Sequence, residues 1–475
     1  MVDGATTVVT ARNDGGRADA VVLFGATGDL ARKKLFPAIY EMSVAGRLGV
    51  PVIGVARSEW DDDKLRDYAR AAVEATANGS MDEGAFSALA RDLTMQVGDY
   101  ADPALYRALA DKLAECALPV FYLAIPPSVF PSVVEGLSSV GLADRGRVIV
   151  EKPFGRDRVS ARSLNDCLLA AFPEKSVFRI DHYLGKESVE GLLVFRFANA
   201  FLEPFWNRNY VAGVQVTLSE AFGTQGRGGF YDGVGATRDV LQNHLLQVVA
   251  LLAMEPPIAD DADAYRDEEV KVLRQVAPLD PASTVRGQYV GYLDETGVAA
   301  TSATETFVAT KLSIDSWRWA GVPFYLRAGK NLPGGATEAV VELRRPPRML
   351  FTGIDADAPE TNLVRFRLGH SDGVTMSVQA KAPGARTHAK SVDLNVDFES
   401  ALGHRSEAYQ RLLDDAMDGT RHRFARADTI EEEWRIVEPI LDLPERPVPY
   451  YKQTWGPADA DKLTGNGWHD VSLKV

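Results

Sequence analysis

The chain has 475 residues, of which 52 are Lys or Arg and 66 are Asp or Glu, so its formal net charge is −14. Hydrophobic residues make up 46% and charged residues 25% of the sequence, which excludes global disorder and collagen-like structure. A protein this acidic binds nucleic acid and anionic membranes poorly, so we expect neither as a partner. An anionic ligand would need a locally basic pocket.

The two cysteines, Cys116 and Cys167, are too few for a disulfide framework or a cysteine-based zinc site, and we expect no metal centre. No stretch approaches the ~18 apolar residues of a membrane span, and the polar N-terminus lacks the apolar core of a signal peptide. We therefore expect a cytoplasmic enzyme or binding protein, with residues 1–19 as a flexible arm.

Strand-like and helix-like segments alternate over the first third of the chain. Short apolar runs predict buried parallel strands at residues 20–24, 50–56, 120–125 and 147–151. Helices are predicted at residues 30–46, 61–77, 105–114 and 129–140. This alternation is typical of a doubly wound α/β fold, so we expect a Rossmann-type domain over residues 20–180.

A glycine-containing turn follows the first predicted strand and opens the first predicted helix. Gly25 permits the tight turn, Gly28 lets the backbone approach a pyrophosphate, and Ala31 is small enough for close packing of helix on strand. The pyrophosphate would lie at the helix N-terminus. The pattern is GxxGxxA rather than the full GxGxxG, so an ordinary strand–helix turn remains the alternative.

The end of the second predicted strand indicates which dinucleotide would bind. Enzymes that prefer NAD usually carry an acidic residue there, whereas this chain has Arg57. An arginine can pair with the 2′-phosphate of NADP. The alternative is that Arg57 is only a solvent-facing loop residue.

The pattern changes after about residue 180. Helical segments at residues 186–197, 236–254 and 268–277 precede strand-like runs at residues 306–314, 323–327, 339–344, 363–368, 374–381 and 391–396. Many of these runs alternate apolar and polar residues, which predicts a mostly antiparallel sheet with helices on one face. We expect this larger β+α domain to span residues 181–475.

Three segments are dense in polar side chains: residues 151–155, 179–187 and 238–247. The first begins with Glu-Lys-Pro at the carboxyl end of a predicted parallel strand, which is the edge where such sheets bind ligands. The third places Asp, Asn and His on or near one helix face, although His244 alone is more commonly a structural residue.

Residues 179–187, RIDHYLGKE, resemble the signature of the glucose-6-phosphate dehydrogenase family. The turn at residues 25–31, Arg57, the Glu-Lys-Pro segment, the polar helix and the RAGK sequence at residues 327–330 occur in the family's order. The resemblance therefore covers nearly the whole chain after residue 20, and the arm lies outside it.

The resemblance implies an oxidoreductase of the pentose phosphate pathway that oxidises carbon 1 of glucose 6-phosphate to the lactone with hydride transfer to NADP. It implies His244 as the general base and Asp181 as the partner that fixes its tautomer. Substrate contacts are implied for Lys152, His182, Tyr183, Lys186, Glu220, Asp239 and Lys330. Contacts to NADP are implied for Gly25, Thr27, Gly28, Asp29, Leu30, Arg57 and Lys152.

The phosphate clamp implied by the resemblance consists of His182, Tyr183 and Lys186, because a dianion binds cations and hydroxyl donors. Family members often carry another basic residue a few positions beyond the one at Lys330, whereas residues 331–334 here read NLPG. At the dinucleotide turn, Lys33 and Lys34 of the first predicted helix could add positive potential, although lysines on a helix surface are usually only solvated. Five histidines outside any motif receive no role: His370, His388, His404, His422 and His469.

The family forms dimers and tetramers, so we expect a homodimer or a homotetramer. Two other interpretations stay open. Another sugar dehydrogenase would share the Glu-Lys-Pro segment, but would not be expected to carry the whole 179–187 string. A non-catalytic sugar-phosphate or NADPH sensor would be expected to lose the base or its partner, yet both Asp181 and His244 are present.

Overall fold

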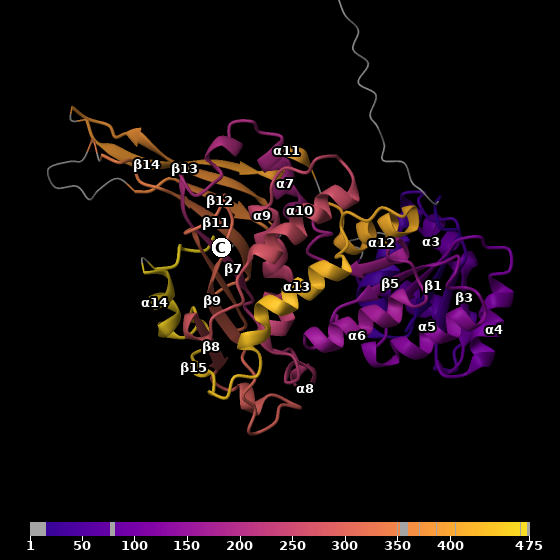
Figure 1. Ribbon diagram of the computed structural model, residues 1–475. Coiled ribbons are helices and arrows are strands. Elements are labelled where there is room, and N and C mark those ends of the chain that lie inside the picture. Colours follow the sequence, from indigo (N-terminus) through magenta and orange to yellow (C-terminus); the bar gives the residue numbers. More distant parts are fainter. Residues whose placement is uncertain are drawn as a thin grey trace, which may run out of the picture.

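The computed structural model describes residues 16–76, 81–348, 350–351, 360–369, 371–385, 387–403, 405–465 and 467–472. A six-stranded sheet organises the N-terminal part, and a nine-stranded sheet organises most of the larger C-terminal part (Figure 1). This arrangement confirms the predicted combination of a Rossmann-type α/β fold with a larger β+α part.

The first sheet is parallel and has the strand order β3-β2-β1-β4-β5-β6. Its strands are β1 (Ala20–Phe24), β2 (Val52–Ala56), β3 (Leu93–Val97), β4 (Pro119–Leu123), β5 (Arg147–Glu151) and β6 (Val177–Ile180). Its helices are α1 (Phe36–Val44), α2 (Asp62–Glu74), α3 (Glu83–Asp92), α4 (Pro103–Lys112), α5 (Phe130–Ser139) and α6 (Arg158–Leu169). Every residue of β1, β2 and β4 is buried, which is why these strands are continuous apolar runs.

The strand order reverses at β1. Val21 of β1 is opposite Val52 of β2 on one side and Val120 of β4 on the other. In open parallel sheets, ligands bind in the crevice beside the carboxyl ends of strands at such a reversal. The turn at residues 25–31 follows β1 and Lys152 follows β5, so both lie at this edge.

The second sheet has the order β14-β13-β12-β11-β7-β10-β9-β8-β15. Its strands are β7 (Val211–Ser219), β8 (Thr284–Tyr289), β9 (Phe307–Ser313), β10 (Pro323–Gly329), β11 (Ala336–Leu343), β12 (Leu363–Arg367), β13 (Gly373–Lys381), β14 (Ala389–Asp397) and β15 (Val448–Tyr450). The pairs β10–β7 and β15–β8 are parallel, and the other pairings described are antiparallel. The predicted, mostly antiparallel sheet is therefore confirmed.

Helices lie against one face of this sheet (Figure 1). They are α7 (Glu187–Phe197), η5 (Thr237–Leu245), α9 (Leu246–Ala253), α10 (Ala262–Gln275) and α13 (Ala427–Val437). The first of the two central segments, η5, is a π-helix that continues directly into α9 and contacts β7, β9 and β10. Its buried Leu241 and Leu245 share one hydrophobic core with Val216 of β7 and Leu326 of β10.

The remaining elements are one helix of 11 residues, α12, and several shorter segments. They are α8 (Gly228–Tyr231), α11 (Phe398–Leu402), α12 (Ala408–Asp418), α14 (Asp461–Thr464), the π-helical η1 (Ala31–Leu35) and the 3₁₀ turns η2 (Pro127–Val129), η3 (Glu174–Ser176), η4 (Glu203–Phe205), η6 (Pro281–Ser283), η7 (Tyr292–Asp294), η8 (Glu438–Ile440) and η9 (Ala458–Ala460). Among the described residues, no helix combines the length and the apolar character that a membrane span requires.

The helix α12 comes late in the sequence but packs onto the first domain (Figure 1). Its buried Leu412 and Met417 belong to the same hydrophobic core as Val21 of β1 and Phe36 of α1. One side of the Rossmann-type domain is therefore completed by residues from the far end of the chain.

The end of the expected N-terminal arm contacts the same helix. The Ala18 N–H donates to the Met417 carbonyl at 2.7 Å, and the Asp19 side chain accepts from the Leu118 N–H at 2.9 Å. Of the arm expected to be flexible over residues 1–19, Ala18 and Asp19 are thus hydrogen-bonded, and residues 1–15 lie outside the described residues.

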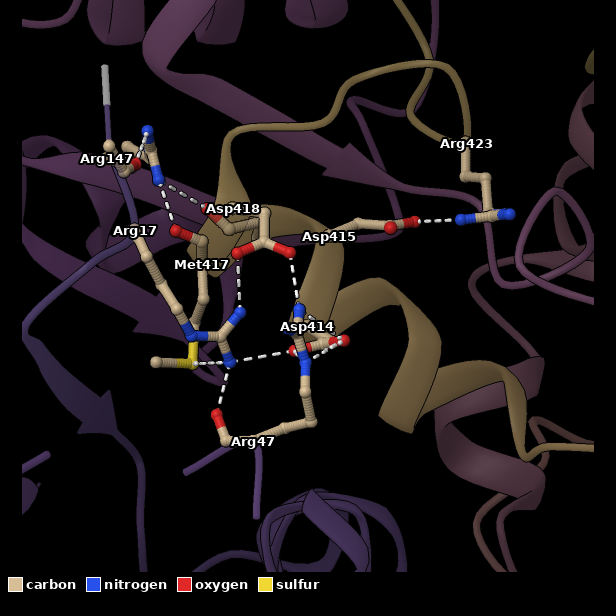
Figure 2. A network of polar contacts seen from close by, with 10 residues as sticks. Arg17, Arg47, Arg147, Asp414, Asp415, Met417, Asp418 and Arg423 are labelled. Atoms are coloured by element: carbon tan, nitrogen blue, oxygen red, sulfur yellow. Dashed lines mark hydrogen bonds and ion pairs between the residues drawn. The ribbon is translucent and has the colours of Figure 1, made fainter. Parts of the chain in front are cut away.

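Two arginines of the first domain pair with the acidic end of α12 (Figure 2). Arg17 pairs with Asp418 at 2.6 Å and with Asp414 at 2.8 Å, and Arg47 pairs with the same two carboxylates at 2.5 and 3.1 Å. These side chains are partly exposed, so water screens each pair and its individual contribution to stability is small. Together the four ion pairs join the C-terminal end of α12 to Arg17 and Arg47.

Arg147 at the start of β5 makes the buried part of the same connection (Figure 2). Its guanidinium donates to the carbonyl oxygens of Ala416 at 3.1 Å, Met417 at 2.5 Å and Gly16 at 2.9 Å. Removing a donor from buried acceptors costs about 1–3 kcal/mol for each group left unpaired. We expect Arg147→Met to lower the free energy of unfolding by about 2–4 kcal/mol, measured by chemical denaturation.

The matched control is Lys462→Met, which removes a cation from an exposed pair with Asp459. We expect no measurable change in the free energy of unfolding for this control, because solvent screens the pair. An equally small change for Arg147→Met would contradict a structural role for the connection to α12.

Candidate active site

The turn after β1 has the geometry of an anion-binding helix N-terminus. Gly25 has φ +80°, and a Cβ there would lie 2.3 Å from the Ala124 carbonyl oxygen, so this position requires glycine. The Gly25 N–H donates to the Val55 carbonyl at 2.8 Å, which ties the turn to β2. No side chain caps η1, whose N-cap residue is Leu30, so the first N–H groups of this helix can face a ligand.

The end of β2 lies beside this turn. The hydroxyls of Thr27 and Ser58 are 3.3 Å apart, and Arg57 between β2 and Ser58 is exposed. Burial raises the pKa of Tyr100, whose hydroxyl accepts from the Gly25 N–H, and the nearby Arg57 cation partly offsets this effect. The arginine that the sequence singled out thus stands next to the predicted dinucleotide turn.

At the opposite end of the edge, Lys152 joins the first sheet to η5. Its ammonium nitrogen lies 3.0 Å from His244 Nε2, 2.9 Å from the Asp239 carbonyl oxygen and 3.4 Å from Asp239 Oδ1. The π-helical geometry explains this double contact, because i→i+5 hydrogen bonding brings residues five positions apart to one side. The same spacing lets the Asn243 side chain donate to the Arg238 carbonyl at 3.0 Å.

His244 and Asp181 form a buried pair. His244 Nδ1 lies 2.6 Å from Asp181 Oδ1, and that oxygen also accepts from the Tyr183 N–H at 2.8 Å. Burial lowers the pKa of His244 well below its usual range, and the Lys152 cation lowers it further. The ring is therefore neutral at neutral pH, with Nδ1–H donated to Asp181 and the Nε2 lone pair directed toward Lys152.

The side chains of residues 182–186 surround this pair. The Tyr183 ring stacks on His244 at 4.1 Å, and the Lys186 ammonium lies 3.5 Å from the centre of the Tyr183 ring. His182 contacts His244 edge to face at 4.5 Å. Burial lowers the pKa of His182 well below its usual range, and burial lowers that of Lys186 to about 8, with Lys152 and Lys34 adding to the effect on Lys186. A buried cluster with this excess of positive charge favours an anionic ligand.

Two carboxylates, Glu220 and Asp239, are balanced by two lysines on the other side of the centre. Lys330 pairs with Glu220 at 2.5 Å and lies 3.6 Å from Asp239 Oδ2. Burial raises the pKa of Asp239, but Lys152 and Lys330 outweigh it, so this carboxyl has a net lowered pKa and is ionised. The NLPG segment after Lys330 turns back so that the Leu332 N–H donates to the Glu220 carbonyl at 3.0 Å, and it brings no cation to the site.

The predicted site residues thus fall into two groups. The dinucleotide set lies around the turn after β1 and the end of β2, whereas the substrate set lies around His244; Lys152 stands at the boundary. Of the histidines without an assigned role, His422 pairs with Glu190 and His469 with Glu342. His370 and His404 lie outside the described residues.

Sequence reasoning missed a group that lies next to Lys152. The Tyr122 hydroxyl donates to the Glu151 carboxylate, and Tyr409 of α12 also hydrogen-bonds to it. Burial raises the pKa of Glu151 to about 7. Tyr409 also stacks near His182, with ring centres 6.4 Å apart. The Glu-Lys-Pro segment was a signal for Glu151, but no local pattern indicates Tyr409, because its contact depends on the docking of α12.

Two family models together match almost all of the chain. The model described as glucose-6-phosphate dehydrogenase, NAD binding domain, matches residues 22–191, and the model described as glucose-6-phosphate dehydrogenase, C-terminal domain, matches residues 193–469. The chain is 42% identical over 475 residues to glucose-6-phosphate 1-dehydrogenase 1 of Mycobacterium tuberculosis, covering 100% of this chain and 99% of the relative. It is 41% identical to glucose-6-phosphate 1-dehydrogenase of Aggregatibacter actinomycetemcomitans, covering 95% and 97%.

Solved structures show the same similarity. Glucose-6-phosphate 1-dehydrogenase from Mycobacterium avium superposes with a TM-score of 0.90 at 43% identity, covering 97% of this chain and 100% of that one. A glucose-6-phosphate dehydrogenase in complex with its substrate glucose 6-phosphate superposes with a TM-score of 0.88 at 34% identity, covering 96% and 99%.

The buried Lys186 predicts a measurable effect on stability. Because its pKa falls from 10.5 to about 8 on folding, the folded chain binds the proton less well than the unfolded chain. This penalty is complete below about pH 8 and disappears as the pH rises toward 10.5. We expect Lys186→Met to raise the Tm at pH 7, and the increase to shrink as the pH approaches 10.5, measured by thermal denaturation.

Lys33→Met serves as the control, because Lys33 is exposed and its pair with Asp29 lies at the surface. We expect little change in Tm for this variant at either pH. A Lys186→Met variant less stable than the parent at pH 7 would show that the ammonium is well compensated in the unliganded protein.

Proposed function

Because the chain belongs to the glucose-6-phosphate dehydrogenase family, we propose that it oxidises carbon 1 of glucose 6-phosphate to 6-phosphoglucono-1,5-lactone with NADP as the electron acceptor. The observation that carries the proposal is the buried His244–Asp181 pair, 2.6 Å apart, next to Lys152 at the carboxyl edge of the first sheet. A neutral base, a cation and a dinucleotide turn at one edge are what removal of hydride and proton from an alcohol requires.

The proton of the sugar's C1 hydroxyl is accepted by His244 Nε2. The hydrogen bond from Nδ1 to Asp181 leaves Nε2 as the acceptor, and the carboxylate stabilises the imidazolium that forms. Lys152 donates to Nε2 at 3.0 Å. We infer that the substrate hydroxyl takes this place and that the Lys152 ammonium then donates to a sugar oxygen.

The dinucleotide-binding domain of the family corresponds here to residues 22–191, which supports use of NAD or NADP. We propose NADP. The fit rests on the uncapped helix N-terminus after Gly25 for the pyrophosphate, and on the exposed Arg57 beside Thr27 and Ser58 for the 2′-phosphate. When bound, NADP supplies the hydride acceptor; Gly28, Asp29 and Leu30 complete the turn that would hold it.

The phosphate of the substrate is proposed to bind His182, Tyr183 and Lys186. A dianion there would offset the desolvation cost of the buried Lys186 cation. It would therefore raise the lowered pKa of Lys186. Lys34 of η1 lies near enough to Lys186 to lower its pKa, so it offers a further cation on this side of the site. Glu220, Asp239 and Lys330 are proposed to hold the other sugar hydroxyls, as paired carboxylates and ammonium groups suit hydroxyl groups.

Assembly and location are further parts of the proposal. The edge strand β14 exposes Val392, Leu394 and Val396, and an exposed apolar strand of this kind supports a homodimer or homotetramer. Both cysteines are free thiols, which agrees with a reducing compartment, and we propose a cytoplasmic location.

The central test is the rate of NADP reduction with glucose 6-phosphate and with free glucose, for the wild-type chain and for His244→Asn. We expect the wild type to prefer the phosphorylated sugar. A positioned general base contributes about 10²–10⁴-fold to rate, so His244→Asn should lower kcat by that order with little change in KM.

Two further variants separate the roles of neighbouring residues. Asp181→Asn should lower kcat in the same direction, because the wrong tautomer disables the same base. His182→Asn should mainly raise KM for glucose 6-phosphate. If His182→Asn abolishes turnover while His244→Asn retains it, the roles are reversed and the proposed mechanism is wrong.

The cofactor proposal predicts a selective effect at Arg57. Loss of one charge-assisted contact costs about 1.5–3 kcal/mol, so Arg57→Ala should raise KM for NADP about ten- to a hundredfold. NAD has no 2′-phosphate, so its KM should hardly change and serves as the internal control. Equal losses for both cofactors would show that Arg57 acts on a part that they share.

A further inference from the structure

A second buried carboxyl group lies behind the His244–Asp181 pair. Glu433 stands on α13, which packs against η5, and its side chain is only 2% exposed. One carboxyl oxygen accepts from Gln247 Nε2 at 2.6 Å, and the other accepts from Gln242 Nε2 at 3.3 Å. The two glutamines flank His244 on the same continuous helix, so Glu433 is connected to the element that carries the base.

A small cavity separates this group from the pair. Its walls include Asp181, Asn243, Gln247 and Glu433, together with the stem of Lys152, and it has room for about one water molecule. Asp181 Oδ2 and Gln247 Oε1 are both buried, and neither has a hydrogen-bond partner among the described residues. Two acceptors at one cavity therefore need donors, and leaving them without donors is costly.

Glu433 can supply one of the missing protons. Burial raises its pKa well above the usual range for a carboxyl group, and the negative charges of Asp181 and Glu269 add to this effect. The charged or titratable basic groups that face the cluster are His182, Lys152 and Lys186 near Asp181, and Arg266 and Arg426 near Glu269; the side-chain hydrogen bond from Gln247 also opposes the rise in the pKa of Glu433. A neutral carboxylic acid has an O–H donor that an ionised carboxylate lacks.

We propose that Glu433 is a positioning residue for the general base: its carboxylic acid donates to one water molecule in the cavity, and that water donates to Asp181 Oδ2 and to Gln247 Oε1. Asp181 Oδ1 then stays directed at His244 Nδ1 and the Tyr183 N–H, since both carboxylate oxygens have fixed partners. This inference rests on the proposed roles of His244 and Asp181.

The test introduces Glu433→Ala and Glu433→Gln into two backgrounds, the wild-type chain and the Asp181→Asn variant. For each protein, kcat and the KM values for glucose 6-phosphate and NADP are measured. We expect Glu433→Ala to lower kcat about tenfold and to change KM for glucose 6-phosphate and for NADP less than about twofold. Glu433→Gln should keep at least about half of the wild-type kcat, because the amide has the shape of the neutral acid and retains an N–H donor. In Asp181→Asn, Glu433→Ala should cause almost no further loss.

Glu269→Ala is the matched control. Glu269 is also 2% exposed and lies on the neighbouring helix α10, but it does not line the cavity. We expect this control to lower Tm while kcat stays within about twofold of the wild type, because burial, the largest cause of the raised pKa of Glu433, remains. If Glu433→Ala does not fold at the assay temperature, Glu433→Leu, which refills the space, should show the same loss of kcat.

Three results would overturn the inference: a folded Glu433→Ala or Glu433→Leu with wild-type kcat, a loss that adds fully to that of Asp181→Asn, or a Glu433→Gln as impaired as Glu433→Ala. Full turnover in Asp181→Asn would overturn the proposed mechanism, and the inference about Glu433 with it. Loss of kcat in Asp181→Asn with none in the Glu433 variants would remove the inference and leave the proposed function intact.

Discussion

The hydrogen bond between His244 and Asp181 connects the two sheets at the site. Asp181 follows β6, the last strand in the order of the first sheet, whereas His244 stands on η5, which lies against the second sheet. Lys152 repeats the connection from the end of β5. Because these groups are buried, a shift of either half would leave polar atoms without partners, which costs more than the net gain of an ordinary hydrogen bond. The relative placement of the two sheets and the geometry of the site therefore depend on each other.

The distribution of charge differs between the two sides of this connection. On one side, Lys330 and Lys152 are balanced by Glu220 and Asp239, a polar neutral surface that suits hydroxyl groups. On the other side, Lys186 rests on an aromatic ring, and burial makes its ammonium group easier to deprotonate. The chain as a whole has a net charge of −14, so this local excess of cations attracts an anion against the overall field. The uncompensated positive charge thus lies on the side of Lys186, as the proposed phosphate site requires.

The sequence predicts the features that depend on neighbouring residues. The apolar run of β1 and the turn at Gly25 are both local features, and the predicted strands and helices around them are found in the structure. Three features of the site have no local signal. The π-helical η5 brings Asp239 and His244 to the same lysine, whereas a period of 3.6 residues would turn them apart. Tyr409 reaches Glu151 only because α12 folds back, and Glu433 faces the cavity only because α13 packs on η5. Such contacts depend on tertiary packing, and the roles of the site residues themselves stay predictions.

The return of α12 to the first domain has a consequence for synthesis on the ribosome. When residues 20–180 have emerged, their sheet can form, but the surface later covered by Leu412 and Met417 is still exposed to solvent. At typical elongation rates the missing helix follows on the order of tens of seconds later. During that interval the nascent domain presents an apolar patch bordered by Arg17, Arg47 and Arg147, all without their eventual acidic or carbonyl partners. The first domain is therefore completed only when α12, near the end of the chain, has been synthesised. A truncated chain that ends before α12 would keep the apolar patch exposed and would be prone to aggregate.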